Sequence, residues 1–466
     1  MDTKKLRQKI LDLAIRGKLV PQDPNDEPAS VLLERIRAEK EQLIKEGKIK
    51  RSKKSAASDT SHYENVPFEV PESWCWAHLS DVCNVARGGS PRPIKEYLTD
   101  DKNGINWIKI GDADKDGKYI NSTKEKISPS GISKSRMVHK GDFLLTNSMS
   151  FGRPYILNID GCIHDGWLVI SPIPKTYDPE FLYYLLSSGF AYSQFTEAAS
   201  GGVVSNLNSD KVGNSLFPLP PQSEQKRIVS ELEKLFEAIR LIDNNKLLIR
   251  HNIEQIRSKI LELAISGKLV HQNTSDEPAI ELLKRINPAY KPADNRHYGN
   301  LPDSWEICQL KDIFDITMGQ SPAGNTINGK CGTEFHQGKI NFTEKYLSES
   351  SQYTTTPSKT AAPESLLLCV RAPVGVVNIT KREICIGRGL CSLRPKYDID
   401  CLYWLYILST LKDYFEENAT GSTFKAISGD IIRNACIPLP PLSEQKRILS
   451  KINELFCLLD KITAEL

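Results

Sequence analysis

Apolar residues recur at alternating spacings of four and three along the middle of the chain. They fall at Ile228, Leu232, Leu235, Ile239, Ile242, Ile249, Ile253, Ile256, Ile260 and Leu263. This heptad pattern predicts one long amphipathic helix, capped by Ser223, in which Lys246 is the one polar interruption of the apolar stripe. Because one helix cannot bury its own apolar face, a stripe of this length requires a partner helix.

Both halves of this stretch occur a second time, at the two ends of the chain. The sequence FPLPPQSEQKRI, which ends at Ile228, returns as IPLPPLSEQKRI, which ends at Ile448, at an offset of 220 residues. The later sequence KILELAISGKLV matches KILDLAIRGKLV near the N-terminus at an offset of 250 residues. The two termini therefore repeat the central helix between them, and the internal repeat is circular. Lys246 and Leu466 occupy matching places in it.

Two segments of similar order lie between the helical regions. Each begins with PESW or PDSW, ending at Trp74 and Trp305, and continues with short strand-like runs. An amphipathic helix is predicted late in the first segment, from Pro179 to Phe195. We predict an α/β fold in which two related domains alternate with two long helical regions, packed as an antiparallel coiled coil with a circular pseudo-two-fold repeat. The two tryptophans are predicted core anchors, because both domains keep them.

The predicted boundaries follow from these repeats. Residues 1–64 form an N-terminal helical region and basic linker, which complete the distal helical region; 65–220 form the first domain; 221–298 the central helical region and linker; 299–440 the second domain; and 441–466 the C-terminal helix. In the first part we predict a helix over residues 2–16, closed by Gly17, and a second helix from Asp26 to about Ile44.

Composition and charge exclude few classes of protein. Lys and Arg number 61 against 58 Asp and Glu, and the resulting net charge of +3 is not the strongly basic balance that by itself indicates nucleic-acid binding. The basic cluster from Lys48 to Lys54 is interpreted as a solvated hinge rather than a phosphate contact. The 11 cysteines form no CxxC pair, which favours reduced thiols, no metal site and the cytoplasm. No apolar run approaches the roughly 20 residues of a membrane span.

Three short motifs resemble catalytic or cofactor-binding signatures without their context. GNTINGKC, from Gly324 to Cys331, lacks the hydroxyl residue and the following helix of a phosphate-binding loop. NPAY at Asn287 lies in a linker, and GRG at Gly387 precedes a strand-like run and not a helix. The sequence therefore predicts neither a cofactor site nor a catalytic centre.

The doubled PLPPxSEQKRI motif, together with GDFLLTNSMSFG and IGRGLCSLRP, resembles the specificity subunit of type I restriction-modification systems over nearly the whole chain. The resemblance implies two target-recognition domains, each of which reads one half of a split, asymmetric site in double-stranded DNA. It implies two modification (methyltransferase) subunits and restriction (endonuclease/translocase) subunits as partners. S-adenosylmethionine, ATP and Mg are expected on those subunits and not on this chain. The alternatives are a coiled-coil adaptor with two non-DNA ligand domains and, more distantly, a free-standing methyltransferase or nuclease.

Base edges are read by forked donors such as Arg and by amides such as Asn and Gln. Lys and Ser/Thr contact the phosphates. The loops with this equipment supply the DNA-binding candidates. In the first domain these are Arg87, Ser90, Arg92, Lys95, Asn147, Ser148, Arg153, Ser200, Asn206 and Lys211, and in the second Gln320, Ser321, Asn325, Arg371, Thr420, Ser422 and Lys425. The loops as sets are favoured over any single member, because phosphate and structural roles outnumber base contacts.

Three further hypotheses concern the helical regions. The recurring DEPA helices carry Leu32, Leu33, Leu282 and Leu283, which either dock a modification subunit or simply complete a helix cap and turn. The stripe from Ile228 to Leu263 spans on the order of 52 Å at about 1.5 Å per residue, so we expect the helices to set the spacer between the half-sites. Residues 1–250 contain one complete repeat unit and are expected to pair with themselves.

Overall fold

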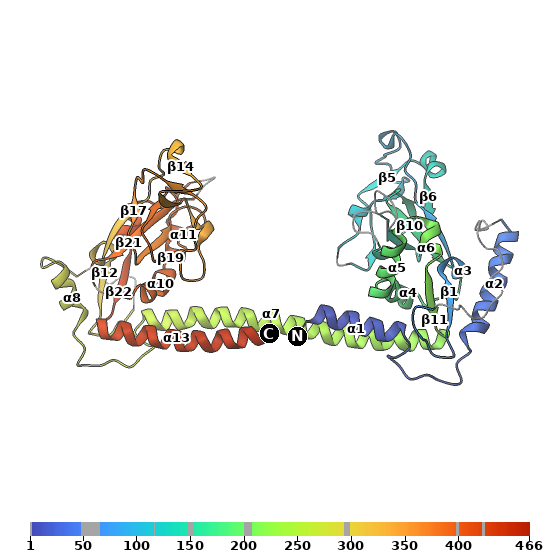
Figure 1. Ribbon diagram of the computed structural model, residues 1–466, viewed down its shortest axis with the longest axis horizontal. Coiled ribbons are helices and arrows are strands. Elements are labelled where there is room, and N and C mark those ends of the chain that lie inside the picture. The colour runs from blue at the N-terminus through green and yellow to red at the C-terminus, as the bar shows by residue number, and fades with distance from the viewer. Residues whose placement is uncertain are drawn as a thin grey trace. The chain divides into compact units, whose positions relative to one another are not determined.

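The computed structural model describes residues 2–47, 66–115, 117–147, 152–199, 207–292, 299–397, 400–421 and 425–466. The chain divides into two compact units, Met1–Asn244 and Asn245–Leu466, and each has its own hydrophobic core. The boundary falls inside one 44-residue helix, α7 (Gln222–Ile265), which contributes its first half to one unit and its second half to the other (Figure 1). The predicted long helix is confirmed, although it begins one residue before Ser223, which lies in its first turn.

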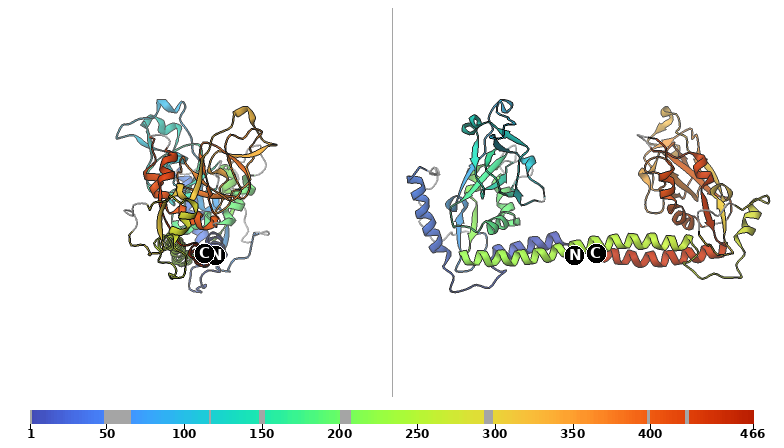
Figure 2. Two further views of the ribbon diagram at one scale, coloured as in Figure 1. Left: turned by 90° about the vertical axis from the view of Figure 1, so that its left-hand side faces the viewer. Right: turned by 180° about the vertical axis from the view of Figure 1, so that it is seen from behind.

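Each half of α7 packs against a helix from one end of the chain (Figures 1 and 2). In unit 1, α1 (Thr3–Ile15) shares a core with the first half of α7, and Arg7 lies 4.0 Å from Asp243. In unit 2, α13 (Leu442–Glu465) shares a core with the second half, and Arg257 pairs with Asp460. Lys246 donates a hydrogen bond to the carbonyl of Leu466. The order of these contacts makes both helix pairs antiparallel, as predicted.

The apolar stripe of α7 is covered only in part. Ile239 and Ile253 are buried, whereas Ile242, Ile249 and Ile256 are 36%, 38% and 47% exposed. The helices within each unit therefore leave the stripe partly uncovered at these three positions. The polar interruption at Lys246 lies between Ile242 and Ile249 in the sequence, and in unit 2 it contacts Leu466 at the end of α13.

Unit 1 carries a mixed α/β domain. Its strands are β1 (Cys75–His78), β2 (Cys83–Arg87), β3 (Ile105–Ile108), β4 (Tyr119–Ile120), β5 (Glu125–Ile127), β6 (Arg136–Val138), β7 (Phe143–Thr146), β8 (Pro154–Leu157), β9 (Gly161–Ile163), β10 (Trp167–Pro172) and β11 (Leu216–Leu219). They form a β1-β11 pair, a five-stranded sheet in the order β2-β10-β7-β8-β4 and a four-stranded sheet in the order β5-β3-β9-β6. The remaining helices are α2 (Ala29–Lys45), α3 (Leu79–Val82), α4 (Pro179–Leu186), α5 (Gly189–Ala199) and α6 (Ser209–Gly213), with the 3-10 helices η1 (Ile94–Glu96), η2 (Ile110–Asp112) and η3 (Pro129–Lys134).

Unit 2 repeats the central part of this plan. Its strands are β12 (Glu306–Gln309), β13 (Phe314–Met318), β14 (Ile327–Asn328), β15 (Thr333–His336), β16 (Tyr353–Thr354), β17 (Thr360–Ala361), β18 (Ser365–Cys369), β19 (Val377–Thr380), β20 (Ile384–Ile386), β21 (Leu390–Pro395) and β22 (Cys436–Leu439). The sheet order β13-β21-β18-β19 corresponds to β2-β10-β7-β8, and the β12-β22 pair to β1-β11. The helices are α8 (Ala279–Ile286), α9 (Leu310–Ile313), α10 (Cys401–Ser409), α11 (Lys412–Glu417) and α12 (Gly429–Asn434), with η4 (Gly324–Thr326) and η5 (Lys339–Asn341). The predicted α/β fold with two related domains is confirmed.

Two local predictions were wrong for reasons of hydrogen bonding. The single helix expected from Pro179 to Phe195 is two helices, because the hydroxyl of Ser188 accepts a hydrogen bond from the Ala191 amide and starts a new helix. The second helix of the chain begins at Ala29 and not at Asp26. The Asp26 carboxylate instead pairs with Arg227 of α7 at 3.2 and 2.6 Å.

The repeated SEQKR motif joins each domain to its long helix. In unit 1, Glu224 is fully buried and accepts hydrogen bonds from the Trp74 indole and from Gln22. The two terminal nitrogens of Arg227 donate to the two carboxylate oxygens of Asp26. Gln225 receives the Asp178 amide at 2.7 Å and so holds the start of α4. Burial raises the pKa of the Glu224 carboxyl, and the bonds from Trp74 and Gln22 oppose that shift.

The same joint recurs in unit 2. Glu444 accepts from Trp305 and Gln272, and Arg447 pairs with Asp276 at 3.3 and 2.6 Å. The indole-bearing residues are only 6% and 7% exposed, so the prediction that Trp74 and Trp305 are core anchors is confirmed. The motif recurs because it attaches each domain to its helix.

All 11 cysteines are free thiols, and burial raises the pKa of Cys75 to about 12. Over the ranges that the structure describes, no helix combines the length and apolarity needed to cross a bilayer.

Candidate nucleic-acid interface

In unit 1, backbone hydrogen bonds bring together three loops that are distant in the sequence. The Gly88 amide, just after β2, donates to the Trp167 carbonyl at 2.9 Å, and the Gly89 amide donates to the Ile163 carbonyl at 3.2 Å. The Asn147 amide, just after β7, donates to the Gly166 carbonyl at 3.1 Å. The turn between β9 and β10 is therefore held by backbone hydrogen bonds from the residues that follow β2 and β7.

A glycine is required where the backbone after β2 comes closest to the β9–β10 turn. A Cβ atom on Gly88 would lie 2.2 Å from the His164 carbonyl oxygen, and one on Gly319 would lie 2.2 Å from the Gly387 carbonyl oxygen. Both approaches are too short for any side chain. The glycine shared by RGGSPRP and MGQSPAG is therefore explained by the close approach of two backbones.

Four of the residues predicted from the sequence converge on Asp165, which the sequence analysis did not identify. The Asn147 amide group and the Arg87 Nε donate to the Asp165 carbonyl at 2.8 and 3.3 Å. Ser90 Oγ donates to Asp165 Oδ1 at 3.0 Å, and Arg92 Nη2 lies 3.5 Å from Oδ2. The candidate loops thus form one polar cluster around the β9–β10 turn.

The electrostatics of this cluster keep the Asp165 carboxyl ionised. Burial by itself would raise the pKa of Asp165, but the Ser90 hydrogen bond and the nearby His164 and Arg92 outweigh burial, and the pKa is lowered. Asn147 is only 1% exposed and its amide already serves Asp165, so Asn147 positions the turn instead of presenting a free group.

The other candidates of unit 1 are scattered. Arg153 lies over the Tyr155 ring at 5.5 Å, Lys211 lies on α6, and Lys95 is exposed on η1 away from the Asp165 contacts. Ser148, Ser200 and Asn206 lie outside the described residues, as does the basic cluster from Lys48 to Lys54. Arg136, absent from the sequence-based set, is exposed and donates to the Arg87 carbonyl at 2.6 Å.

Unit 2 has the same set of three backbone hydrogen bonds, which we call the loop frame, formed by different residues. The Gly319 amide donates to the Leu390 carbonyl at 2.9 Å, the Gln320 amide to the Ile386 carbonyl at 3.0 Å, and the Val370 amide to the Gly389 carbonyl at 3.0 Å. These bonds match those of unit 1 position by position, so the turn between β20 and β21 corresponds to the turn between β9 and β10.

The side chains on this second frame differ. Ser321 donates to Gln337 Oε1 at 3.1 Å, and Ser358 donates to the Gln320 carbonyl. Arg371 and Thr420 both form backbone bridges with Ala426, and the Lys425 carbonyl accepts from the Ala372 amide at 3.1 Å, which brings the loops after β18 and α11 together. Asn325 lies apart on η4, and Ser422 lies outside the described residues.

A recess of about 210 Å³ opens beside these loops. Gln337, Lys339 and Arg371 supply its polar lining, and Cys369, Pro373 and Gly389 belong to its wall. Lys339, Arg371 and the neighbouring Arg388 are all exposed. The sequence-based candidates do not include Gln337, Lys339 and Arg388; the signal in the sequence for Arg388 is the GRG motif, which resembles part of a dinucleotide site.

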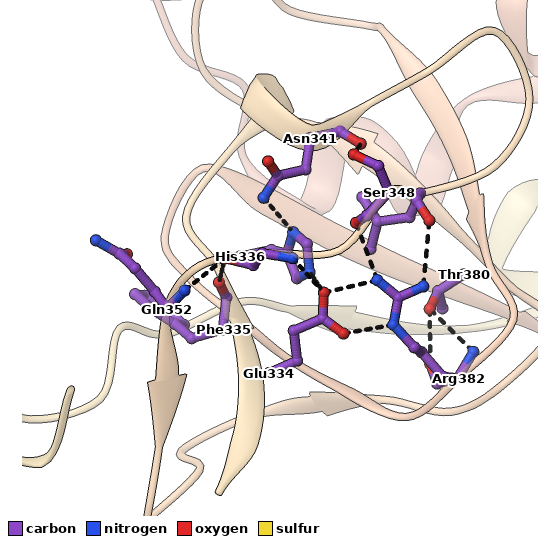
Figure 3. A network of polar contacts seen from close by, with 10 residues as sticks. Glu334, Phe335, His336, Asn341, Ser348, Gln352, Thr380 and Arg382 are labelled. Carbon is purple, nitrogen blue, oxygen red and sulfur yellow. Dashed lines mark hydrogen bonds and ion pairs between the residues drawn. The ribbon is translucent and has the colours of Figure 1, made fainter. Parts of the chain in front are cut away.

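A buried polar network holds the strand that leads to this recess (Figure 3). Glu334 on β15 receives Arg382 at both carboxylate oxygens, His336 at 2.8 Å and the Ser350 amide at 2.6 Å. Burial alone would raise the pKa of Glu334, but these bonds lower it to about 2. Burial also lowers the pKa of His336, against the opposing effect of Glu334. The network fixes β15 and thereby the position of Gln337.

The motifs that resembled cofactor sites have structural roles. In GNTINGKC, Asn328 accepts the amides of Lys330 and Cys331 in a tight turn. Asn287 of NPAY ends α8, and Tyr290 donates to the Ile307 carbonyl. Within the described ranges, no group of three or more His, Cys, Asp or Glu residues could hold a metal ion.

The proposed docking leucines face inward. Leu32, Leu33, Leu282 and Leu283 are 3%, 7%, 6% and 1% exposed. Leu32 and Leu33 belong to the core of unit 1 and Leu283 to that of unit 2. Their side chains attach α2 and α8 to the chain's own domains, so a partner would have to contact the opposite faces of these helices. Docking through α2 and α8 stays a prediction.

Comparison with known proteins assigns the fold to a class. The family model described as the type I restriction modification DNA specificity domain matches residues 71–250 and again residues 302–466. These two matches cover both domains and most of the long helices. The chain therefore belongs to the family of type I restriction-modification DNA specificity proteins.

Individual relatives agree with this membership. The chain is 27% identical to the type I restriction enzyme EcoEI specificity subunit of Escherichia coli, over 99% of this chain and 90% of that protein. It is 30% identical to the putative type I restriction enzyme MjaX specificity subunit of Methanocaldococcus jannaschii, over 82% and 87%. A solved chain of the type I R-M system matches with a TM-score of 0.62 at 26% identity, over 86% of this chain and 94% of that one. The HsdS subunit of Thermoanaerobacter tengcongensis matches with a TM-score of 0.53 at 27% identity, over 86% and 93%.

Proposed function

We propose that this chain is the DNA-recognition subunit of a type I restriction-modification complex, and that each domain reads one half of a bipartite, asymmetric site. The observation that carries the proposal is the pair of loop frames. Three matched backbone hydrogen bonds, the first donated by Gly88 in one unit and by Gly319 in the other, hold the two turns. The side chains around the two turns nevertheless differ in identity and charge. One scaffold with two different polar surfaces is what the readout of two different half-sites requires.

Family membership supports the partners and cofactors that we propose. The helix pairs and the outward faces of α2 and α8 are available to modification subunits, and restriction subunits join the same complex. S-adenosylmethionine, ATP and Mg would be bound by those subunits. The chain itself would supply recognition without catalysis and act in the cytoplasm. A coiled-coil adaptor for ligands other than DNA is not supported by the comparisons.

Reconstitution with type I modification subunits tests the proposal. The assembled complex, supplied with S-adenosylmethionine, should methylate DNA within one bipartite motif that has an unread spacer, and methylation mapping of a bacterial genome would reveal that motif. The modification subunits without this chain should deposit no such pattern, and this chain alone should transfer no methyl group. Methylation without a bipartite motif would contradict the proposal.

A further inference from the structure

One turn position carries opposite charges in the two frames. Asp165 lies between His164 and Gly166 in the β9–β10 turn, and Arg388 lies between Gly387 and Gly389 in the β20–β21 turn. The matched hydrogen bonds place both residues at the same point of the turn. Each lies two residues after an isoleucine, Ile163 or Ile386, whose carbonyl accepts a hydrogen bond from the amide of Gly89 or Gln320. The backbone is preserved there while the charge is reversed.

We propose that Asp165 and Arg388 are specificity-determining residues of the two half-sites. The Asp165 carboxylate would accept a hydrogen bond from an exocyclic amino group, that of cytosine or adenine. The Arg388 guanidinium would donate to O6 and N7 of guanine. This inference rests on the proposed function, and it names the contacts by which each domain distinguishes its half-site.

The surroundings of Arg388 leave its guanidinium available. Arg388 is exposed, and among the described residues no side chain or carbonyl forms a hydrogen bond or ion pair with it. The recess that includes Gln337, Lys339 and Arg371 adjoins it through Gly389. The fork of an arginine beside an amide and two further cations forms a donor-rich surface suited to the acceptor edge of guanine and to flanking phosphates.

The surroundings of Asp165 leave one oxygen available. Oδ1 accepts a hydrogen bond from Ser90 Oγ at 3.0 Å and lies 3.2 Å from His164 Nε2, so the carboxylate is held in one orientation. Among the described residues, the printed partner of Oδ2 is Arg92 at 3.5 Å, whose side chain is 83% exposed. An ionised carboxylate at a DNA surface is repelled by phosphates, and Arg87, Arg92 and Arg136 nearby offset that repulsion. An acceptor aimed at a base amino group explains its presence there.

The competing explanation is that Asp165 only ties the loops together. Substitutions can separate the two roles, because Ser90→Ala removes the tie and keeps the carboxylate, whereas Asp165→Asn keeps an acceptor for Ser90 and removes the charge. In unit 2, Arg388→Lys keeps the positive charge for a phosphate contact and removes the fork that a guanine contact uses.

The test maps methylation by the full complex containing wild-type, Asp165→Asn, Ser90→Ala, Arg388→Gln or Arg388→Lys chains. We expect Asp165→Asn to relax one position of one half-site, which is C or A in the wild-type motif, by roughly 10- to 100-fold in preference. Arg388→Gln and Arg388→Lys should relax one guanine of the other half-site by a similar factor. Ser90→Ala loosens the carboxylate without removing it, so it should reduce the preference at that position by less than Asp165→Asn does. In each variant the unaltered half-site serves as the internal control.

Three outcomes would overturn the inference while leaving the proposed function intact. One is a wild-type bipartite motif that no substitution alters at a single position. Another is a uniform loss of methylation in Arg388→Gln that Arg388→Lys restores, which identifies a phosphate contact. The third is an equal loss in Ser90→Ala and Asp165→Asn, which identifies a structural tie. A wild-type complex without any bipartite motif would instead count against the proposed function itself.

Discussion

The indole Nε1 of Trp74 donates a 2.8 Å hydrogen bond to the fully buried carboxylate of Glu224, across 150 residues of sequence. Trp305 donates the corresponding bond to Glu444 at 2.9 Å. Each tryptophan begins a domain and each glutamate begins a long helix, so this bond is the point at which the recognition surface is fixed to its support. The precision of both loop frames depends on the rigidity of that joint.

Loss of this bond should weaken the joint. Trp74→Phe keeps an aromatic ring but leaves the buried Glu224 carboxylate without its indole donor. We expect the free energy of unfolding of unit 1 to fall by about 1–3 kcal/mol, measured by hydrogen exchange of the β1 and β11 amides. Trp305→Phe should have the same effect on unit 2, at β12 and β22.

Trp76 supplies the matched control. It is as buried as Trp74, at 7% against 6%, but its Nε1 has no hydrogen-bond partner among the described residues. Trp76→Phe therefore removes similar volume without removing a hydrogen bond, and it should destabilise unit 1 less than Trp74→Phe. Equal effects of the two substitutions would show that packing, and not the bond to Glu224, holds the joint.

Acid should destabilise unit 2 through Glu334. Its folded-state pKa of about 2 lies below its ordinary value of 4.5, so its contribution is fully present above pH 4.5 and is lost as the pH falls toward 2. The contribution is on the order of 3 kcal/mol at neutral pH. The free-energy difference between wild type and Glu334→Gln, followed by urea unfolding, should therefore shrink between pH 5 and pH 2.

His336 acts in the same direction. Its lowered pKa means that protonation disfavours the folded state, so stability is also lost as the pH falls below about 6.5. Glu383→Gln is the control for this series, because Glu383 is exposed and lies next to Arg382 in the sequence. That variant should follow the wild-type pH dependence; a difference of constant size between wild type and Glu334→Gln at every pH would contradict the assignment to the Glu334 charge.

Insertion of one heptad after Asn244 should lengthen the DNA spacer. The site lies at the boundary between the two units, so the Arg7–Asp243 pair stays within unit 1 and the Lys246–Leu466 bond within unit 2. Seven residues add about 10 Å of helix, which corresponds to about three base pairs. Methylation mapping should show both half-site sequences unchanged and the spacer extended; an unchanged spacer would show that the helices do not set it.

A fragment of residues 1–250 should form a self-paired unit. Unit 1 has its own core, and Leu241 and Ile242 on α7 are 59% and 36% exposed, which provides apolar surface for a second copy. With modification subunits the fragment should direct methylation to a palindromic site built from the first half-target. Sedimentation measures the pairing, and methylation mapping measures the site. A monomeric fragment without activity would contradict the expectation.

The sequence determined the parts of this protein that rest on local periodicity and on self-comparison. The long helix from Gln222 to Ile265 follows from the heptad stripe, and its antiparallel partners follow from the two terminal repeats. The burial of Trp74 and Trp305 follows from their retention in two otherwise different domains. These features depend on residues near one another in the chain, or on motifs that occur twice, so they can be recognised without coordinates.

Only the tertiary structure decided which polar residues meet. Ser90 and Asp165 are 75 residues apart and are joined because β2 and the β9–β10 turn are clasped by backbone hydrogen bonds, which no pattern of residue types specifies. The inward orientation of Leu32 and Leu282 was equally open, since an amphipathic helix shows which face is apolar but not what covers it. Register and helix orientation are set by contacts between distant segments, and for that reason the charge reversal between Asp165 and Arg388 became visible only when the two frames could be superposed bond by bond.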